Sequence, residues 1–158
     1  MTEETFSAFR PLLSVSMGDP VGIGPEVVVK ALSVPEIRDD ADFVVYGDPA
    51  VLARAIELTH VGATVEVIEQ PLAARRFSNA RAIPCVPISQ LPSENFGWAQ
   101  PTPDADRAQI EYVERSVRAI FDGSVDGVVT APINKASIAR AGSTYPGHTE
   151  MLADLCGR

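Results

Sequence analysis

Histidine, cysteine and clustered basic residues are scarce in this chain, and each scarcity excludes a class of function. The sequence has two histidines and two cysteines, and Cys85 and Cys156 lie too far apart for a metal-binding or redox motif. The net charge is −8, and no run of lysine or arginine exceeds the pair Arg75 and Arg76. A basic face that binds nucleic acid is therefore not expected.

Long apolar runs are absent as well. No stretch approaches the ~18 apolar residues that a membrane-spanning helix needs. Residues 1–10, MTEETFSAFR, are polar and acidic and contain no apolar signal-peptide core, so we expect a loose arm there. Together these features predict a cytoplasmic protein with reduced cysteines and with neither a membrane nor a nucleic acid as its partner.

The rest of the composition is that of one ordinary globular domain, since 46% of the 158 residues are hydrophobic and 22% are charged. Short apolar runs alternate with helical patterns, and the runs are apolar on both faces. This alternation favours a mostly parallel sheet that is covered by helices. The predicted strands, of which the fourth is weakened by a proline, are Leu12–Ser16, Asp42–Tyr46, Val65–Ile68, Ala82–Val86 and Val125–Thr130.

Two helices are indicated by their first residues. Pro25 suits the first position of a helix because its missing N–H would be unpaired there in any case. Asp48 before a proline suits the N-cap of a second helix, which continues to about Glu57. The apolar face of the first helix is predicted to be Val27, Val28, Ala31 and Leu32.

The clearest helix is Asp104–Phe121, which follows a long irregular loop predicted for Pro87–Pro103. Shorter helices are predicted at Ala136–Arg140 and at Glu150–Leu155, with Thr149 as the N-cap of the latter. The apolar residues of the long helix recur at helical spacing and are Ile110, Val113, Val117, Ile120 and Phe121.

Gly18, Gly22 and Gly24 lie between a predicted strand and a predicted helix, where N–H groups and a helix dipole can meet an anion. The loop is not a P-loop, and Val27 stands where a dinucleotide fingerprint has its third glycine. Spacing alone favours a tight strand–helix turn formed with Asp19. The alternative is a cofactor-binding role for Asp19 and Gly22.

Polar residues gather in the stretch Val128–Glu150, VVTAPINKASIARAGSTYPGHTE. Asn134 could bind an amide or a hydroxyl and Lys135 a phosphate or a carboxylate, or Asn134 could cap the next helix while Lys135 is solvated. His148 follows a Pro-Gly turn, which predicts a loop position. There it could bind a ligand, act in catalysis, or be solvated. One suitable histidine cannot complete a metal site, so we expect no metal ligands here.

Four segments, in this order, carry a resemblance: MGDPVGIGPEVVVKAL, YGDPAVL, VVTAPINKASIARAG and YPGHTEMLADL. They resemble the 4-hydroxythreonine-4-phosphate dehydrogenase family of vitamin B6 (pyridoxal phosphate) biosynthesis, over about Leu12–Arg158. The resemblance implies an α/β fold with three layers, α/β/α, as in the isocitrate/isopropylmalate dehydrogenases. It also implies that His148 and Thr149 contact the substrate, and it extends to Asn134 and Lys135 as further substrate-binding residues.

The activity that the resemblance implies is that of an NAD- or NADP-dependent dehydrogenase. Its substrate would be 4-phosphooxy-L-threonine (4-hydroxythreonine 4-phosphate), a phosphorylated hydroxy amino acid. Oxidation assisted by a divalent metal (Zn, Mg or Co) and decarboxylation would yield 3-amino-2-oxopropyl phosphate. The complete enzyme is expected to be a homodimer. A paralogous branch with the same motifs oxidises D-threonate or D-erythronate 4-phosphate, and these motifs do not separate the two branches.

Members of that family are much longer than this chain, and their three metal-ligating histidines lie in the second half. We therefore expect an incomplete fold, with residues 1–158 as the N-terminal portion of a two-domain dehydrogenase. Residues 12–125 would form mostly the first domain, and residues 126–158 the start of the second. The isolated chain is then expected to be inactive and to expose apolar surface. Two alternatives are a non-catalytic truncated binding fragment and half of a split enzyme.

Overall fold

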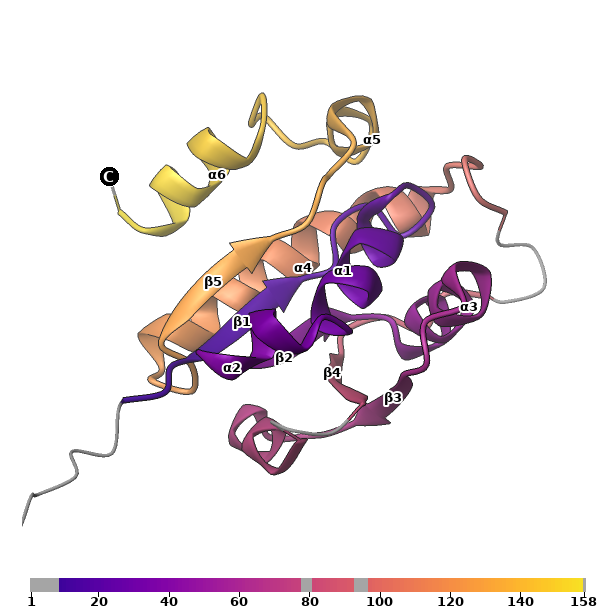
Figure 1. Cartoon of the computed structure of the whole chain (residues 1–158). Coiled ribbons are helices and arrows are strands. Elements are labelled where there is room, and N and C mark those ends of the chain that lie inside the picture. The colour runs from indigo at the N-terminus through magenta and orange to yellow at the C-terminus, as the bar shows by residue number, and fades with distance from the viewer. Residues whose placement is uncertain (1–8, 78–80, 93–96, 158) are drawn as a thin grey trace, which may run out of the picture.

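The computed structural model describes residues 9–77, 81–92 and 97–157, and most of the predicted N-terminal arm lies outside these ranges. Its centre is a sheet of five strands in the order β3-β4-β2-β1-β5 (Figure 1). Every pair of neighbouring strands is parallel, which confirms the predicted sheet. The strands are β1 (Leu12–Ser16), β2 (Asp42–Gly47), β3 (Thr64–Val67), β4 (Ala82–Pro87) and β5 (Gly127–Thr130).

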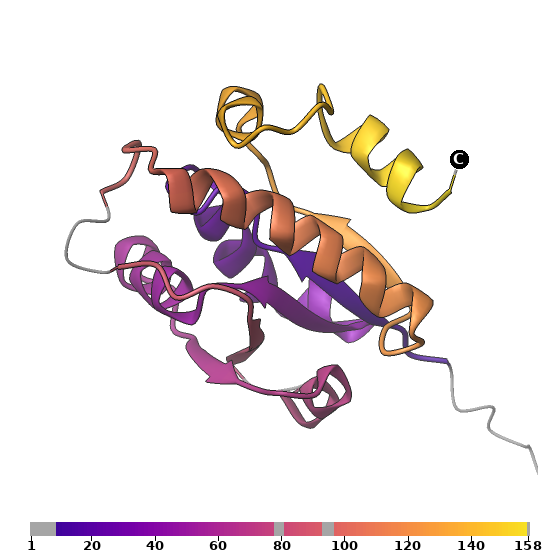
Figure 2. The same cartoon turned by 180° about the vertical axis from the view of Figure 1, so that it is seen from behind.

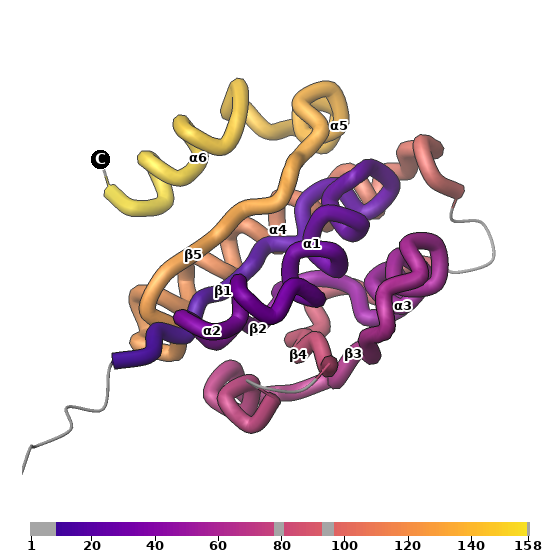
Figure 3. Tube along the Cα trace, in the orientation of Figure 1, coloured from indigo at the N-terminus to yellow at the C-terminus, as the bar shows by residue number. Residues whose placement is uncertain are grey.

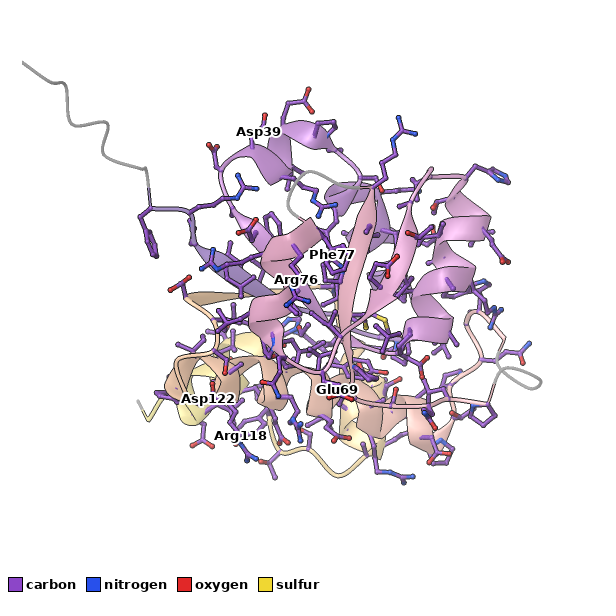
Figure 4. All side chains as sticks on the ribbon, turned by 90° about the horizontal axis from the view of Figure 1, so that it is seen from below. Asp39, Glu69, Arg76, Phe77, Arg118 and Asp122 are labelled. Atoms are coloured by element: carbon purple, nitrogen blue, oxygen red, sulfur yellow. The ribbon has the colours of Figure 1, made fainter. Side chains whose placement is uncertain are left out.

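Helices cover both faces of the sheet, so the predicted three-layer α/β/α arrangement is confirmed. On one face lie α1 (Gly24–Leu32), α2 (Pro35–Asp39) and α3 (Pro49–Thr59). On the other lie the short 3-10 helix η1 (Pro71–Phe77) and α4 (Pro103–Phe121), as the reverse view shows (Figure 2). Figure 4 looks at the molecule from below and separates the first layer, labelled at Asp39, from α4, which is labelled at Arg118 and is followed by Asp122.

The strand that the sequence marked as weakest lies inside the sheet, between β3 and β2. Pro84 cannot donate a ladder hydrogen bond, and the pairing of β4 with β2 begins only at the next residue, Cys85. Just before this point, the buried guanidinium of Arg38 donates to the carbonyl of Ala82 at 2.8 Å and to that of Phe77 at 2.5 Å. A side chain from α2 thus satisfies a carbonyl at the beginning of β4.

Three predictions about buried faces were wrong. Val27 of α1 is 41% exposed, and its neighbour Val29 is buried instead. Phe121 at the end of α4 is 67% exposed. Strand β5 was predicted to be buried, but it lies at the edge of the sheet and leaves Val129 45% exposed. Exposed apolar side chains were expected, and besides Val27 and Val129 they include Ile23, Val34 and Ile37.

After β5 the chain continues into α5 (Lys135–Arg140) and α6 (His148–Leu155), which Figure 3 traces above the edge of the sheet. Both helices contact α4, and together they enclose a hydrophobic cluster that is separate from the two clusters on the sheet. Its buried members are Val113, Val117, Ile138 and Met151. A domain boundary near residue 126 remains a prediction. No helix among the described residues is long and apolar enough to cross a membrane.

Candidate functional site

The carboxyl ends of β1 and β5 define the place where a site can form. From β1 the chain moves to β2 on one side, and after β4 it returns to β5 on the other side of β1. Neighbouring parallel strands whose connections leave in opposite directions create a crevice beyond their carboxyl ends. The glycine loop follows β1, and the segment with Asn134 and Lys135 follows β5, so both predicted groups flank this crevice.

The glycine loop is a tight turn in which the N–H groups of Asp19, Val21 and Gly22 already have hydrogen-bond partners. Asp19 donates its own N–H to the carbonyl of Pro132 at 2.9 Å, and its carboxylate accepts from Val21 N–H at 3.1 Å. Gly22 N–H donates to the backbone carbonyl of Asp19. Burial raises the pKa of the Asp19 carboxyl, against the opposing effect of hydrogen bonds from Val21 N–H and the Asn134 side chain. These contacts favour the turn interpretation, and a cofactor role for Asp19 and Gly22 stays a prediction.

Asn134 is the N-cap of α5, one of the two alternatives that the sequence left open. Its Oδ1 accepts from Ser137 N–H at 3.1 Å, and its own N–H donates to Gln109 Oε1 on α4 at 2.8 Å. With Oδ1 engaged in the cap, Asn134 has less capacity to bind a substrate directly. Its substrate-binding role remains a prediction.

Lys135 extends from the first residue of α5 to the beginning of α6. A Cβ atom on Gly147 would lie 3.4 Å from Lys135 Cε and 3.7 Å from both Lys135 Nζ and the carboxylate oxygen Oε2 of Glu150. Gly147 is the N-cap of α6 and supplies no side-chain cap, so the first N–H groups of the helix have no side-chain partner at that residue. An ammonium group beside an uncapped helix N-terminus is an arrangement that favours an anion.

Two predictions for the start of α6 were wrong. The helix begins at His148 rather than at Glu150, so His148 lies in its first turn and not in a loop. Thr149 is an exposed residue of that turn and not the N-cap. The His148 ring is half-buried, and this burial lowers its pKa, which favours the neutral imidazole. Its Nε2 atom is buried and has no hydrogen-bond partner among the described residues.

Asp106 and Arg140 join this site although the sequence analysis did not identify them. Arg140 Nε donates to Asp106 Oδ2 at 2.9 Å, and Arg140 Nη2 donates to Oδ1 at 3.0 Å. Asp106 and Gln109 lie on the buried face of α4, in line with Val113. Their position on this face could have identified them from the sequence, because buried polar side chains in line with an apolar stripe need hydrogen-bond partners.

The divalent metal implied by the resemblance finds no place in the described part of the chain. No group of three histidine, cysteine, aspartate or glutamate side chains there could hold a metal ion. In the glycine loop, the N–H groups of Asp19, Val21 and Gly22 are bonded to Pro132 and to Asp19 and are not free to bind a pyrophosphate. What the site does present is a lysine, a neutral histidine and a threonine at a helix N-terminus.

Fold and site together define a three-layer α/β protein with a parallel sheet, in which polar residues gather at the crevice beyond the carboxyl ends of β1 and β5. Residues 39–158 match the family described as "Pyridoxal phosphate biosynthetic protein PdxA". Since this match covers most of the chain, the protein belongs to the PdxA family, and the resemblance seen in its motifs is confirmed.

Relatives with two different names are similar to this chain. A 4-hydroxythreonine-4-phosphate dehydrogenase of Desulforapulum autotrophicum is 37% identical over 145 residues, which cover 92% of this chain and 42% of the relative. A D-threonate 4-phosphate dehydrogenase of Cupriavidus necator is 36% identical over 151 residues, which cover 96% of this chain and 44% of the relative. The protein is thus related to dehydrogenases of phosphorylated hydroxy acids, and it spans less than half the length of these relatives.

A solved structure supports the fold. The crystal structure of a 4-hydroxythreonine-4-phosphate dehydrogenase from Burkholderia phymatum aligns with a TM-score of 0.86 and 33% sequence identity. The alignment covers 94% of this chain and 44% of that one. The chain therefore has the α/β fold of these dehydrogenases, which is of the isocitrate/isopropylmalate dehydrogenase type.

Proposed function

We propose that this chain forms one wall of the active site of an NAD(P)-dependent dehydrogenase that oxidises a 4-phosphorylated hydroxy acid. The observation that carries the proposal is the position of Lys135 at the uncapped N-terminus of α6, beside His148 and Thr149. Family membership and the dehydrogenase names of the relatives support the reaction class. In the complete enzyme, which we expect to be a cytoplasmic homodimer, a bound nicotinamide would accept a hydride from the substrate, and the β-keto acid so formed would lose CO₂.

The residues of this chain bind and orient the substrate. Lys135 and the first N–H groups of α6 hold an anionic group, either the phosphate or the carboxylate. Thr149 contributes a hydroxyl that can donate to an oxyanion. The neutral His148 ring accepts or donates one hydrogen bond without adding charge, because burial disfavours its protonated form. Metal ligands are expected from outside the described residues.

The preferred substrate is 4-phosphooxy-L-threonine, oxidised and decarboxylated to 3-amino-2-oxopropyl phosphate. D-threonate or D-erythronate 4-phosphate is the second possibility, and a relative named for D-threonate 4-phosphate favours it to a similar degree. The two kinds of substrate differ at C2, where the first carries an ammonium group and the second a hydroxyl. A comparison of their affinities for the same chain therefore separates them.

Substitution of Lys135 tests the binding role. Lys135→Met is expected to weaken the binding of 4-phosphooxy-L-threonine by about tenfold, because one charge-assisted contact to the anion is lost. Isothermal titration calorimetry at constant ionic strength measures this. Lys30→Met is the matched control, since Lys30 is the one other lysine of the sequence and its nearest charge is Glu26 on its own helix. Equal affinities for wild type and Lys135→Met would contradict the role of Lys135.

The isolated 158-residue chain is expected to show no reduction of NAD⁺ or NADP⁺ with either phosphorylated substrate and added Zn²⁺, Mg²⁺ or Co²⁺. The physical reason is that its described residues supply no three-ligand metal group. The measurement is the absorbance of the reduced nicotinamide, with a complete relative as positive control. Turnover by the purified chain would refute the view that the site is completed elsewhere. Binding without turnover is also what a non-catalytic binding fragment would show.

A further inference from the structure

Helix α5 is too short to hold its own orientation. It has six residues, which is less than two turns, and isolated helices of that length are unstable in water. Its direction must therefore be set by its neighbours, through the buried Ile138 in its middle and through polar contacts at its ends. This matters for the proposed site because Lys135 is the first residue of α5.

Both ends of α5 are held by the same face of α4. At the first end, Asn134 N–H donates to Gln109 Oε1 at 2.8 Å. At the last end, the guanidinium of Arg140 makes two hydrogen bonds to Asp106, whose side chain is 6% exposed. Asp106 and Gln109 are three residues apart and so neighbours on the surface of α4.

Stability alone is a poor explanation for the Asp106–Arg140 pair. A carboxylate taken out of water loses hydration, and such pairs can often be replaced by apolar residues without loss of stability. A bidentate arginine–carboxylate pair does fix the relative orientation of two elements. Arg140 Nη2 also donates to Ser137 Oγ at 2.8 Å, so the same guanidinium joins α4 to the middle of α5.

We propose that Asp106 and Gln109 are positioning residues, which hold α5 so that Lys135 reaches the N-terminus of α6. The effect of this positioning on ligand binding rests on the proposed function of the site. The position of Lys135 itself does not depend on that function. A direct measurement of Lys135 therefore tests the inference separately.

The test uses the fact that the sequence contains two lysines, Lys30 and Lys135. Reductive methylation with ¹³C-formaldehyde gives each a dimethylamine signal in NMR spectra, and the Lys30→Arg variant assigns them. Asp106→Asn is expected to shift the Lys135 signal toward that of a solvated lysine and to leave the Lys30 signal unchanged. Arg140→Gln breaks the same pair from α5 and is expected to cause the same shift, while circular dichroism verifies that both variants are folded.

Asp104→Asn is the matched control, because Asp104 forms an exposed pair with Arg107 on the same helix and does not contact α5. It is expected to leave both lysine signals unchanged. Affinity for inorganic phosphate, measured on the unmethylated chain by NMR titration, is expected to fall about tenfold in Asp106→Asn and to stay constant in Asp104→Asn.

The outcomes separate the two proposals. If the Lys135 signal is the same in wild type, Asp106→Asn and Arg140→Gln, the pair does not position Lys135 and the inference is overturned. If the signal moves as expected but the wild-type chain binds neither phosphate nor 4-phosphooxy-L-threonine, positioning stands and the proposed function of the site fails. A shift together with the loss of phosphate affinity supports both.

Discussion

Replacing Gly18 by alanine is expected to lower the free energy of unfolding by about 3 kcal/mol, from left-handed backbone strain and overpacking together. Gly18 has a φ of +77°, a conformation that side chains with a Cβ rarely adopt. A Cβ there would lie 2.4 Å from the carbonyl oxygen of Pro132 and 2.9 Å from that of Ala131. Both contacts are with backbone, which cannot move aside as a flexible side chain can.

Gly142→Ala separates the two causes. Gly142 also has a positive φ, +89°, but nothing lies within 4 Å of the position its Cβ would take. It should therefore lose only the conformational part, about 1 kcal/mol. Urea unfolding followed by circular dichroism measures both variants against wild type. Losses of equal size would show that the close approach to Pro132 is not important.

The clash at Gly18 also connects stability to the site. Pro132 precedes Asn134 by two residues and receives the N–H of Asp19, so the glycine loop and the segment after β5 are packed backbone against backbone. If the chain still folds with alanine at position 18, the glycine loop and the segment after β5 must move apart. The position of Asn134 and Lys135 would then change with the stability. The close approach of the two segments accounts for glycine at position 18, where a Cβ would meet the backbone of Ala131 and Pro132.

Much of the fold was predictable because it follows from local patterns. The strands near Leu12, Asp42 and Val65, and the N-cap at Asp48, follow from apolar runs and from cap chemistry. What failed depended on partners that local sequence does not name. Val129 is exposed because β5 lies at the edge of the sheet, and its local apolar run does not show this position.

The site was predicted in part, for a similar reason. Short motifs identified Lys135 and His148, but the first residue of α6 could not be read from spacing. The helix follows Gly147, which has no side-chain cap, and begins two residues earlier than predicted. Asp106 was not found because a carboxylate in the first turn of a helix already has a sufficient local explanation in the helix dipole. Its partner, Arg140, lies 34 residues away, and only the folded chain brings them together.

Asp48→Ala is expected to cost about 3–4 kcal/mol, the sum of a lost helix cap and unsatisfied buried donors. Asp48 is buried and accepts four hydrogen bonds. Oδ1 caps α3 by accepting from the N–H groups of Ala50 at 2.9 Å and Val51 at 3.3 Å. Oδ2 accepts from Leu91 N–H at 2.7 Å and from Ser89 Oγ at 3.1 Å, and these bonds hold the beginning of the long loop.

The contact extends to α4, because the Ser89 hydroxyl gives its one proton to Asp48 and so must accept from the Tyr112 hydroxyl, 2.5 Å away. Loss of Asp48 therefore releases α3, the loop and the Tyr112 hydroxyl together. Thr102→Ala is the matched control, since the Thr102 side chain caps α4 by accepting from Ala105 N–H and is separate from the network around Asp48.

The control is expected to lose about 1 kcal/mol, the usual contribution of a helix cap. Asp48→Asn should fall between the two, because one face of the amide must present its NH₂ group to N–H donors. Thermal and urea unfolding of all three variants give the comparison. If Asp48→Ala is no less stable than Thr102→Ala, the bonds to Ser89 and Leu91 add nothing beyond the cap. A larger loss means that one carboxylate joins a helix, a loop and the neighbouring layer at the carboxyl end of β2.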